Sequence, residues 1–81
     1  MGWQARFNPQ AWQNDYAIDV DPEGETHWPI SDDDAQTWLP EAKSPSADLD
    51  RLQDHPNAPR WVRDWRGPFY IELIDPDGLP V

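Results

Sequence analysis

The sequence predicts one α+β domain: a small antiparallel sheet of three to four strands, with two or three short helices on one face. Three observations lead to this fold class. Apolar and polar residues alternate near both ends of the chain, helix-start signals are concentrated between residues 31 and 66, and Pro or Gly separates these segments at short intervals. Strands and helices in separate stretches are typical of α+β domains.

The length of the chain limits it to one hydrophobic core, so we expect residues 1–81 to form a single acidic domain. The sequence contains six Trp and no Cys. Large aromatic side chains, instead of disulfides or thiolate-bound metal, must therefore stabilise this small core.

Two strands are expected in the first quarter of the chain. Apolar and polar residues alternate over residues 3–7, which predicts a strand with one buried face, and Asn8-Pro9 should end it. The same alternation from Tyr16 to Val20 predicts a second strand.

A hairpin is expected to follow, because Asp21-Pro22-Glu23-Gly24 has the composition of a tight turn. Pro presets φ at the second position, and Gly accepts the positive φ of a type I turn with a bulge. The return strand, residues 25–30, contains Pro29, which has no N–H to donate and belongs at a sheet edge.

The middle of the chain predicts short helices. Ser31 is a good N-cap, three acidic residues follow it in the first turn, and Pro40 should end this helix near Leu39. A second helical segment is expected over residues 47–54, before His55-Pro56, and a third opens at Pro59 and stops at Gly67-Pro68.

The last strand is expected over Phe69–Ile74, a segment of β-forming residues that is apolar on both faces. This pattern predicts the central and most buried strand of the sheet. Asp75-Pro76-Asp77-Gly78 then repeats the turn chemistry of residues 21–24.

The formal net charge of −10 restricts the partners that the protein can bind. Such a field repels nucleic acid and anionic membranes and attracts basic surfaces. We therefore expect a protein partner with a basic surface, and no direct binding to nucleic acid or membranes. The N-terminus lacks a signal-peptide pattern, and no segment approaches about 20 apolar residues, so a soluble, cytoplasmic protein is expected.

The candidate partner-binding residues are acids that alternate through the expected hairpin, together with those of the first helical turn. Alternate residues of a strand lie about 6.5–7 Å apart, and duplex DNA spaces its phosphates about 3.4 Å along the axis per strand. The acids could therefore imitate the charge of a nucleic acid, or they could simply keep a sheet edge soluble. These residues are Asp19, Asp21, Glu23, Glu25, Asp32, Asp33 and Asp34.

Other motifs favour structural interpretations. The segment from Asp19 resembles the opening of an EF-hand loop, but Ile30 stands where the bidentate Glu belongs, so no metal is expected. Neither His27 nor His55 has a catalytic or ligand spacing, and we predict no catalytic residue and no cofactor. The Arg- and Trp-containing residues 60–66 could stack on bases, but packing on the sheet is the favoured interpretation.

The expected function is thus that of a non-catalytic acidic protein that occupies a basic surface of another protein, including a nucleic-acid-binding one, as a decoy, inhibitor or regulator. The alternative is a self-associating or accessory subunit domain. Its interface would use surplus Trp surface at Trp3, Trp12 or Trp28, and its acidity would serve only solubility or salt adaptation.

Overall fold

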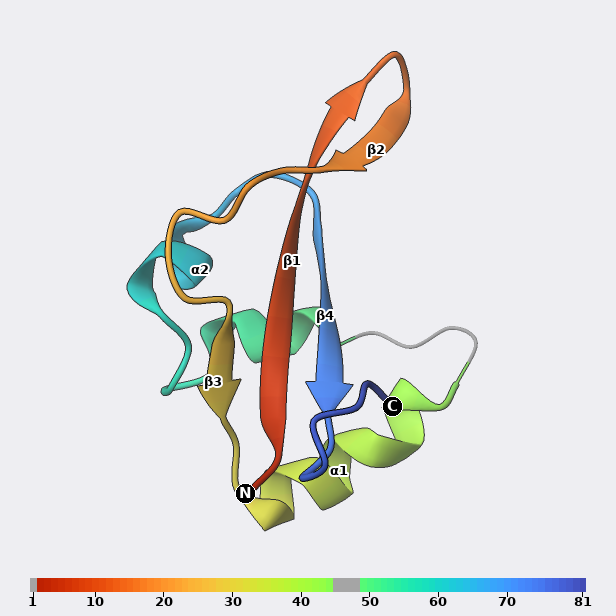
Figure 1. Cartoon of the computed structure of the whole chain (residues 1–81), viewed down its shortest axis with the longest axis vertical. Coiled ribbons are helices and arrows are strands. Elements are labelled where there is room, and N and C mark those ends of the chain that lie inside the picture. The colour runs from red at the N-terminus through yellow and green to blue at the C-terminus, as the bar shows by residue number, and fades with distance from the viewer. Residues whose placement is uncertain (1, 45–48) are drawn as a thin grey trace.

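The computed structural model describes residues 2–44 and 49–81, and it confirms the α+β fold class (Figure 1). Within these residues a four-stranded antiparallel sheet carries the helical segments on one face. The elements in chain order are β1 (Gln4–Gln13), β2 (Tyr16–Asp19), β3 (His27–Pro29), α1 (Asp32–Ala42), the 3-10 helix η1 (Asp50–Asp54), α2 (Arg60–Asp64) and β4 (Phe69–Ile74). None of the helices described is long and apolar enough to cross a membrane.

β1 is the strand around which the sheet is built. Its first half pairs antiparallel with β3 on one side and with β4 on the other, and its second half pairs with β2. The expectation that Phe69–Ile74 is central was wrong, because β1 is the only strand described that pairs with β4. Ile71 and Leu73 are buried on one face of β4, and Ile74 is buried where the returning C-terminal segment forms a bridge at Pro80, which explains the two-sided apolar pattern.

Pro9 does not end the first strand, contrary to the expectation from Asn8-Pro9. In β1 it stands opposite Phe69 of β4, and its carbonyl accepts the N–H of Val20 at 3.3 Å. The N–H that proline lacks would point to the same side as this carbonyl. On that side β3 has already ended and β2 has not yet begun to pair, so the strand tolerates the ring.

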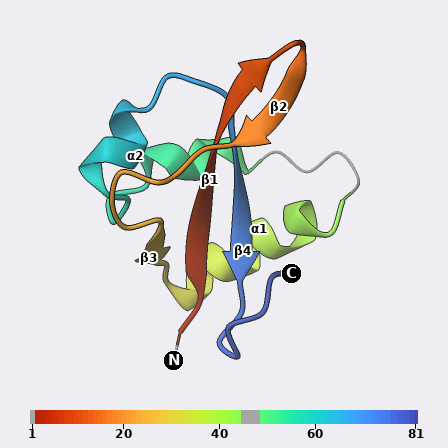
Figure 2. The same ribbon diagram turned by 45° about the horizontal axis from the view of Figure 1, so that its top comes forward.

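The hairpin of this chain forms between β1 and β2, and not at Asp21-Pro22-Glu23-Gly24 as expected. Its two-residue turn consists of Asn14 and Asp15, with φ of 55° and 67°. Positive φ at both central positions identifies a type I′ turn, in which Asn and Asp are favoured. The hairpin projects beyond the rest of the domain, as Figures 1 and 2 show. β3 follows a connecting segment and pairs with β1 instead of β2.

The second acidic turn behaves as its sequence predicts. The Gly78 N–H donates to the Asp75 carbonyl at 2.8 Å, and Gly78 has a φ of 85°. The chain then folds back, and the Val81 N–H donates to the Leu73 carbonyl at 3.0 Å. The last residues therefore cover part of the outer edge of β4.

α1 begins as predicted and ends later than predicted. Ser31 Oγ accepts the Asp34 N–H at 3.0 Å, and the Asp34 carboxylate accepts the Ser31 N–H at 3.4 Å, which forms a capping box. The helix continues past Pro40, where the sequence predicted its end. Pro40 leaves the carbonyl of Gln36 without its helical donor, but both residues are exposed, so water can bond to that carbonyl.

The remaining helical segments lie close to their expected places. The segment expected over residues 47–54 appears as η1, although residues 47 and 48 lie outside the described part, and His55 caps its end. α2 starts after Pro59 and ends before Gly67-Pro68. Both segments pack on the face of the sheet that carries Phe7, where Leu52 of η1 and Val62 of α2 join the core.

The core is centred on Phe7, which points from β1 toward the helices and is only 1% exposed. Its ring lies 5.3 Å from that of Trp61, 6.3 Å from Trp65 and 5.2 Å from Phe69. The aromatic residues of segment 60–66 therefore pack on the sheet, as the favoured interpretation held.

Candidate partner-binding surface

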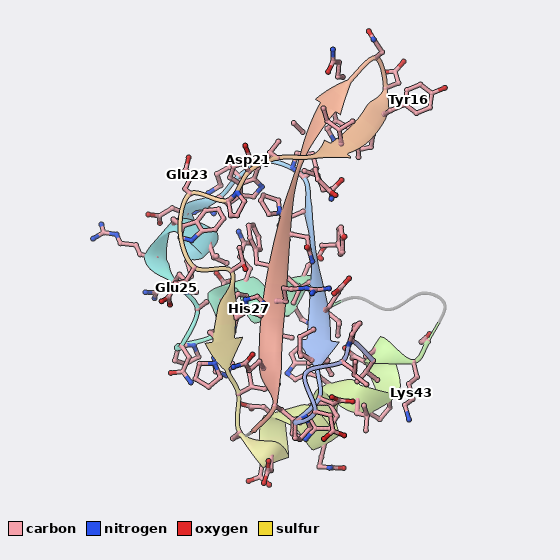
Figure 3. The ribbon with its side chains drawn as sticks, viewed as in Figure 1. Tyr16, Asp21, Glu23, Glu25, His27 and Lys43 are labelled. Carbon is pink, nitrogen blue, oxygen red and sulfur yellow. The ribbon has the colours of Figure 1, made fainter. Side chains whose placement is uncertain are left out.

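The candidate acids do not form a ladder on a hairpin. Asp19 ends β2, whereas Asp21, Glu23 and Glu25 lie in the connection between β2 and β3 (Figure 3). The other acids, Asp32 to Asp34, begin α1, after β3. The strand spacing that suggested regular intervals of charge therefore does not apply to these residues.

The acids of the connection are nonetheless available to a partner. Asp21, Glu23 and Glu25 are exposed, and none forms an ion pair with a basic residue of the described chain. The ion pairs found there are Arg6–Glu72, Arg51–Glu41 at 2.7 Å and Arg60–Asp64 at 3.6 Å, and the ring of His55 contacts Asp34 at 3.0 Å. Lys43 lies at the lower right of Figure 3, just after α1, and away from Asp21, Glu23 and Glu25 in the left half of the view. None of these three acids is therefore neutralised by an ion pair within the described residues.

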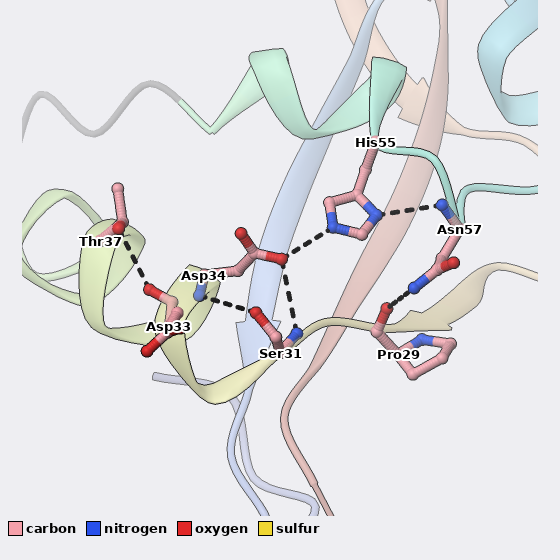
Figure 4. Close-up of polar contacts among 7 residues, drawn as sticks. All are labelled: Pro29, Ser31, Asp33, Asp34, Thr37, His55 and Asn57. Carbon is pink, nitrogen blue, oxygen red and sulfur yellow. Dashed lines mark hydrogen bonds and ion pairs between the residues drawn. The ribbon is translucent and has the colours of Figure 1, made fainter.

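Asp34 is engaged in structural contacts instead (Figure 4). Its carboxylate contacts the Nε2 of His55 at 3.0 Å, and His55 Nδ1 accepts the Asn57 N–H at 3.1 Å. Because Nδ1 is an acceptor, the ring proton of a neutral His55 lies on Nε2 and points at the carboxylate. The hydrogen bond from His55, supported by those from Ser31, holds the pKa of Asp34 below its usual value, although desolvation opposes this shift.

Asp32 and Asp33 lie exposed in the first turn of α1. Negative charge there favours the positive end of the helix dipole, so both have a structural role that needs no partner. The structure thus separates the seven candidates into two groups. Asp19, Asp21, Glu23 and Glu25 precede β3 in the chain, and Asp32, Asp33 and Asp34 follow it.

A groove lies beside the connection, on the face of the sheet that carries no helix. By register, Gln4, Asn8 and His27 lie on the opposite face of the sheet from Ala5, Phe7 and Trp28. A hollow of about 530 Å³ runs over β3 and is lined by Gln4, Pro22, Gly24, Glu25, Thr26, His27, Trp28 and Pro29. A smaller hollow of about 190 Å³, here called the notch, is lined by Phe7, Asn8, Pro9, Asp19, Val20, Pro22 and Thr26.

Trp61 holds the wall of this groove in place. Its Nε1 donates to the carbonyl of Glu25 at 2.8 Å. Gly24 lies so close to the same indole that an added Cβ would be 3.1 Å from Nε1. The connection is therefore drawn toward α2 and away from β1, which leaves the notch between the end of β2 and the start of β3.

The outer edge of β3 is closed to another strand. Pro29 has no N–H, as the sequence indicated for an edge strand, and its carbonyl accepts Asn57 Nδ2 at 2.9 Å. The carbonyl of Glu25 is occupied by Trp61. A partner must therefore engage this side of the molecule through side chains and not by extending the sheet.

The tryptophans offered as an interface have three different environments. Trp28 is buried at 1% exposure, so the expectation that it forms an interface was wrong, and Trp3 is half-buried against the core. Trp12 is 62% exposed and shares the hairpin with Tyr16 at 74% and Ile18 at 46%. The alternation from Tyr16 to Val20 predicts a strand with one buried face, but every residue of β2 is exposed, because β2 pairs only with β1 in a hairpin that projects from the domain.

Among residues 2–44 and 49–81, no group of three or more His, Asp or Glu side chains could hold a metal ion. His27 is exposed, and its Nδ1 lies 3.1 Å from Thr26 Oγ1. No protein-family model, curated protein or solved structure matches the chain.

Proposed function

We propose that this protein is a non-catalytic binding protein that occupies a basic surface of another protein through Asp19, Asp21, Glu23 and Glu25. The observation that carries the proposal is that Asp21, Glu23 and Glu25 are exposed and form no ion pair with a described residue, while Glu25 lines the groove and Asp19 lines the notch. Exposed surface charges add little to folding stability. They do accelerate encounter with an oppositely charged partner.

A basic surface that ordinarily holds nucleic acid is one target for such a protein. The acids would then act by charge density, since they lack the regular spacing of strand residues. A protein bound in this way would compete with nucleic acid for its target, which is the action of a decoy or inhibitor.

The proposal is tested with a neutralised variant and a control of equal charge. The variant carries Asp21→Asn, Glu23→Gln and Glu25→Gln. The control carries Asp33→Asn, Asp54→Asn and Asp77→Asn, at exposed positions outside the connection whose side chains make no hydrogen bond or ion pair with the described residues. Each protein is immobilised, and proteins from the native host are captured at low and high salt and identified by mass spectrometry.

We expect the unaltered protein and the control to capture the same basic protein at low salt, and the neutralised variant to lose it. High salt should release this partner, because the Debye length falls from about 10 Å at 0.1 M to about 3 Å at 1 M. If the captured protein binds nucleic acid, the unaltered domain should displace that nucleic acid. Equal capture by the variant and the control would refute the assignment of these acids.

The projecting hairpin supports a second candidate function, self-association or attachment as an accessory subunit. Its support is the exposure of Trp12, Tyr16 and Ile18, since exposed aromatic residues are enriched in interfaces. Two copies at −10 each repel one another, so this association should strengthen as salt increases. Sedimentation over a range of concentrations and salt separates the two functions, because binding to a basic partner weakens with salt.

A further inference from the structure

We infer that the notch is a pocket for one lysine or arginine side chain of the bound partner, with Asp19 as its counter-ion. This inference rests on the proposed function, which it makes specific. It follows from the walls of the notch, the position of the Asp19 carboxylate and the charges around it.

The walls suit the aliphatic stem of a basic side chain. Pro9, Val20 and Pro22 contribute apolar atoms to the lining, whereas Phe7 is 1% exposed and its ring packs on the helix side. The volume is about 190 Å³, less than the roughly 300–1,000 Å³ of sites for small-molecule ligands. Lys and Arg bury their methylene groups along apolar surface while the charged end reaches a polar partner. A pocket of this size and composition is suited to a single side chain.

The Asp19 carboxylate is fixed at this site. Gln10 stands directly opposite Asp19 in the β1–β2 ladder, and its Nε2 donates to Asp19 Oδ1 at 2.6 Å. Gln10 is only 9% exposed, so its amide cannot swing away freely. The hydrogen bond leaves Asp19 Oδ2 available for a cation, because no described residue donates to it.

The surroundings favour a cation over a neutral or anionic group. No Lys or Arg lines either hollow, and Arg6, on the same sheet face, is paired with Glu72. Tyr70 is opposite Asn8 on this face, and its pKa is raised by burial and further by the charges of Glu72 and Asp19, against a smaller opposing effect of Arg6. The sheet face beside the notch is thus under a negative potential.

Asn8 provides a second polar group at the notch. Its Nδ2 is buried and has no hydrogen-bond partner among the residues described. An unsatisfied buried donor is costly. Because this atom has almost no accessible surface, the Asn8 amide must rotate toward the notch to reach a backbone carbonyl of a bound segment. The adjoining hollow over β3 would take the rest of an extended segment, beside Glu25.

The test uses a synthetic hexapeptide that alternates Lys and Thr, with blocked termini, and an analogue with norleucine in place of each Lys. Norleucine keeps most of the aliphatic stem and removes the charge. Each peptide is titrated into the full-length protein and followed by amide NMR shifts. We expect saturable shifts at Asn8, Val20 and Thr26 with the lysine peptide, and none with the norleucine peptide.

Two variants isolate the pocket. Asp19→Asn keeps an acceptor for Gln10 and removes the charge. It should weaken the lysine peptide by at least about tenfold, because the bound cation would bury part of the exposed Asp19 carboxylate. Val20→Phe keeps every charge and fills the notch, and it should abolish the saturable shifts. Asp33→Asn, with the same loss of charge at α1, should change the affinity less than about twofold, as expected for a distant exposed charge.

The outcomes separate the pocket from the proposed function. Equal loss of affinity in Asp19→Asn and Asp33→Asn, or shifts scattered over all the acidic residues, would overturn the pocket. So would undiminished binding in Val20→Phe. If the neutralised connection variant loses its captured partner while these peptides never bind the unaltered protein, the proposed function stands and the pocket does not.

Discussion

The imidazole of His55 and the carboxylate of Asp34 meet at 3.0 Å, Nε2 to Oδ2, and this contact joins the residue after η1 to the first turn of α1. The Asn57 side chain extends the connection to β3 through the carbonyl of Pro29. Three segments that are separate in the sequence are thus fastened together near the start of α1.

This contact makes stability depend on pH. The hydrogen bond from His55 lowers the pKa of Asp34 from the ordinary value of 3.8. A carboxylate with a lowered folded-state pKa stabilises the fold above the unfolded-state value, and the contribution is lost as pH falls through the lowered one. Asp34→Asn should therefore be less stable than the unaltered protein near neutral pH, and the two should converge as the pH falls below the lowered pKa of Asp34. Urea unfolding from pH 2 to 7 measures this.

Asp33→Asn is the matched control, because Asp33 is adjacent and its side chain is in no ion pair. Its difference from the unaltered protein should change over the same pH interval only by the effect of one charge on the helix dipole, about 0.3–1 kcal/mol. If the difference in free energy of unfolding between Asp34→Asn and the unaltered protein stayed constant across that interval, the contact with His55 would not depend on the charge of the Asp34 carboxylate.

Trp61 should stabilise the fold both by packing and by its hydrogen bond to Glu25. Trp61→Ala should lower the free energy of unfolding by about 3 kcal/mol, the lower end for Trp truncation, because the ring is half-buried. Trp61→Phe keeps an aromatic ring against Phe7 and removes the donor, so we expect a loss of about 1 kcal/mol. Chemical denaturation measures both. Equal losses would mean that the hydrogen bond, and not the ring, dominates.

Amide hydrogen exchange should be slowest in the first half of β1. Ala5 and Arg6 lie between β3 and β4, whereas every residue of β2 is exposed and β2 is paired on one side only. Backbone hydrogen bonds at such exposed edges open at low free-energy cost. Slower exchange at Ile18 than at Arg6 would contradict the central position of β1.

The aromatic residues of β1 should differ sharply in their effect on folding. Trp12 is exposed, so Trp12→Ser should change the free energy of unfolding by no more than about 0.5 kcal/mol. Phe7→Ala removes a buried ring and should cost about 3–5 kcal/mol. Thermal and urea unfolding compare the two. A large loss in Trp12→Ser would indicate that the hairpin is held against the body of the domain.

The sequence predicted those elements whose local chemistry decides their structure. Ser31 caps α1, Pro29 lies at an edge, and Asp75 to Gly78 forms the expected turn, because each needs only its own backbone geometry. The expectations that Pro9 ends the first strand and that Pro40 ends the first helix were wrong. A proline ends a strand or helix only where the carbonyl that loses its N–H donor finds no other hydrogen-bond partner. That depends on neighbouring strands and on exposure to water, which residue order does not contain.

The two acidic turn sequences show the same limit for the candidate site. Asp75-Pro76-Asp77-Gly78 closes a turn, while Asp21-Pro22-Glu23-Gly24 is pulled against Trp61. The acids of the connection were identified from charge alone. That Glu25 lines a groove could not be predicted, because it depends on the contact of the connection with Trp61, a residue far away in the chain. Nothing in the sequence around Asn8, Pro22 and Thr26 indicated that these residues line a pocket.

Pro9 has a consequence for the notch beyond its tolerance in β1. Extending the β1–β2 register by one step places Pro9 opposite Val20, where paired residues would exchange two hydrogen bonds. The Val20 N–H supplies one of them. The second hydrogen bond, from residue 9 to the Val20 carbonyl, cannot form, because proline has no N–H. The β1–β2 ladder therefore ends at Asp19, and the chain turns away from β1 toward α2. Any other residue at this position could complete the pair, lengthen β2 and draw the two walls of the notch together. A single change in the codon for Pro9 could therefore close the notch without altering any residue that carries charge.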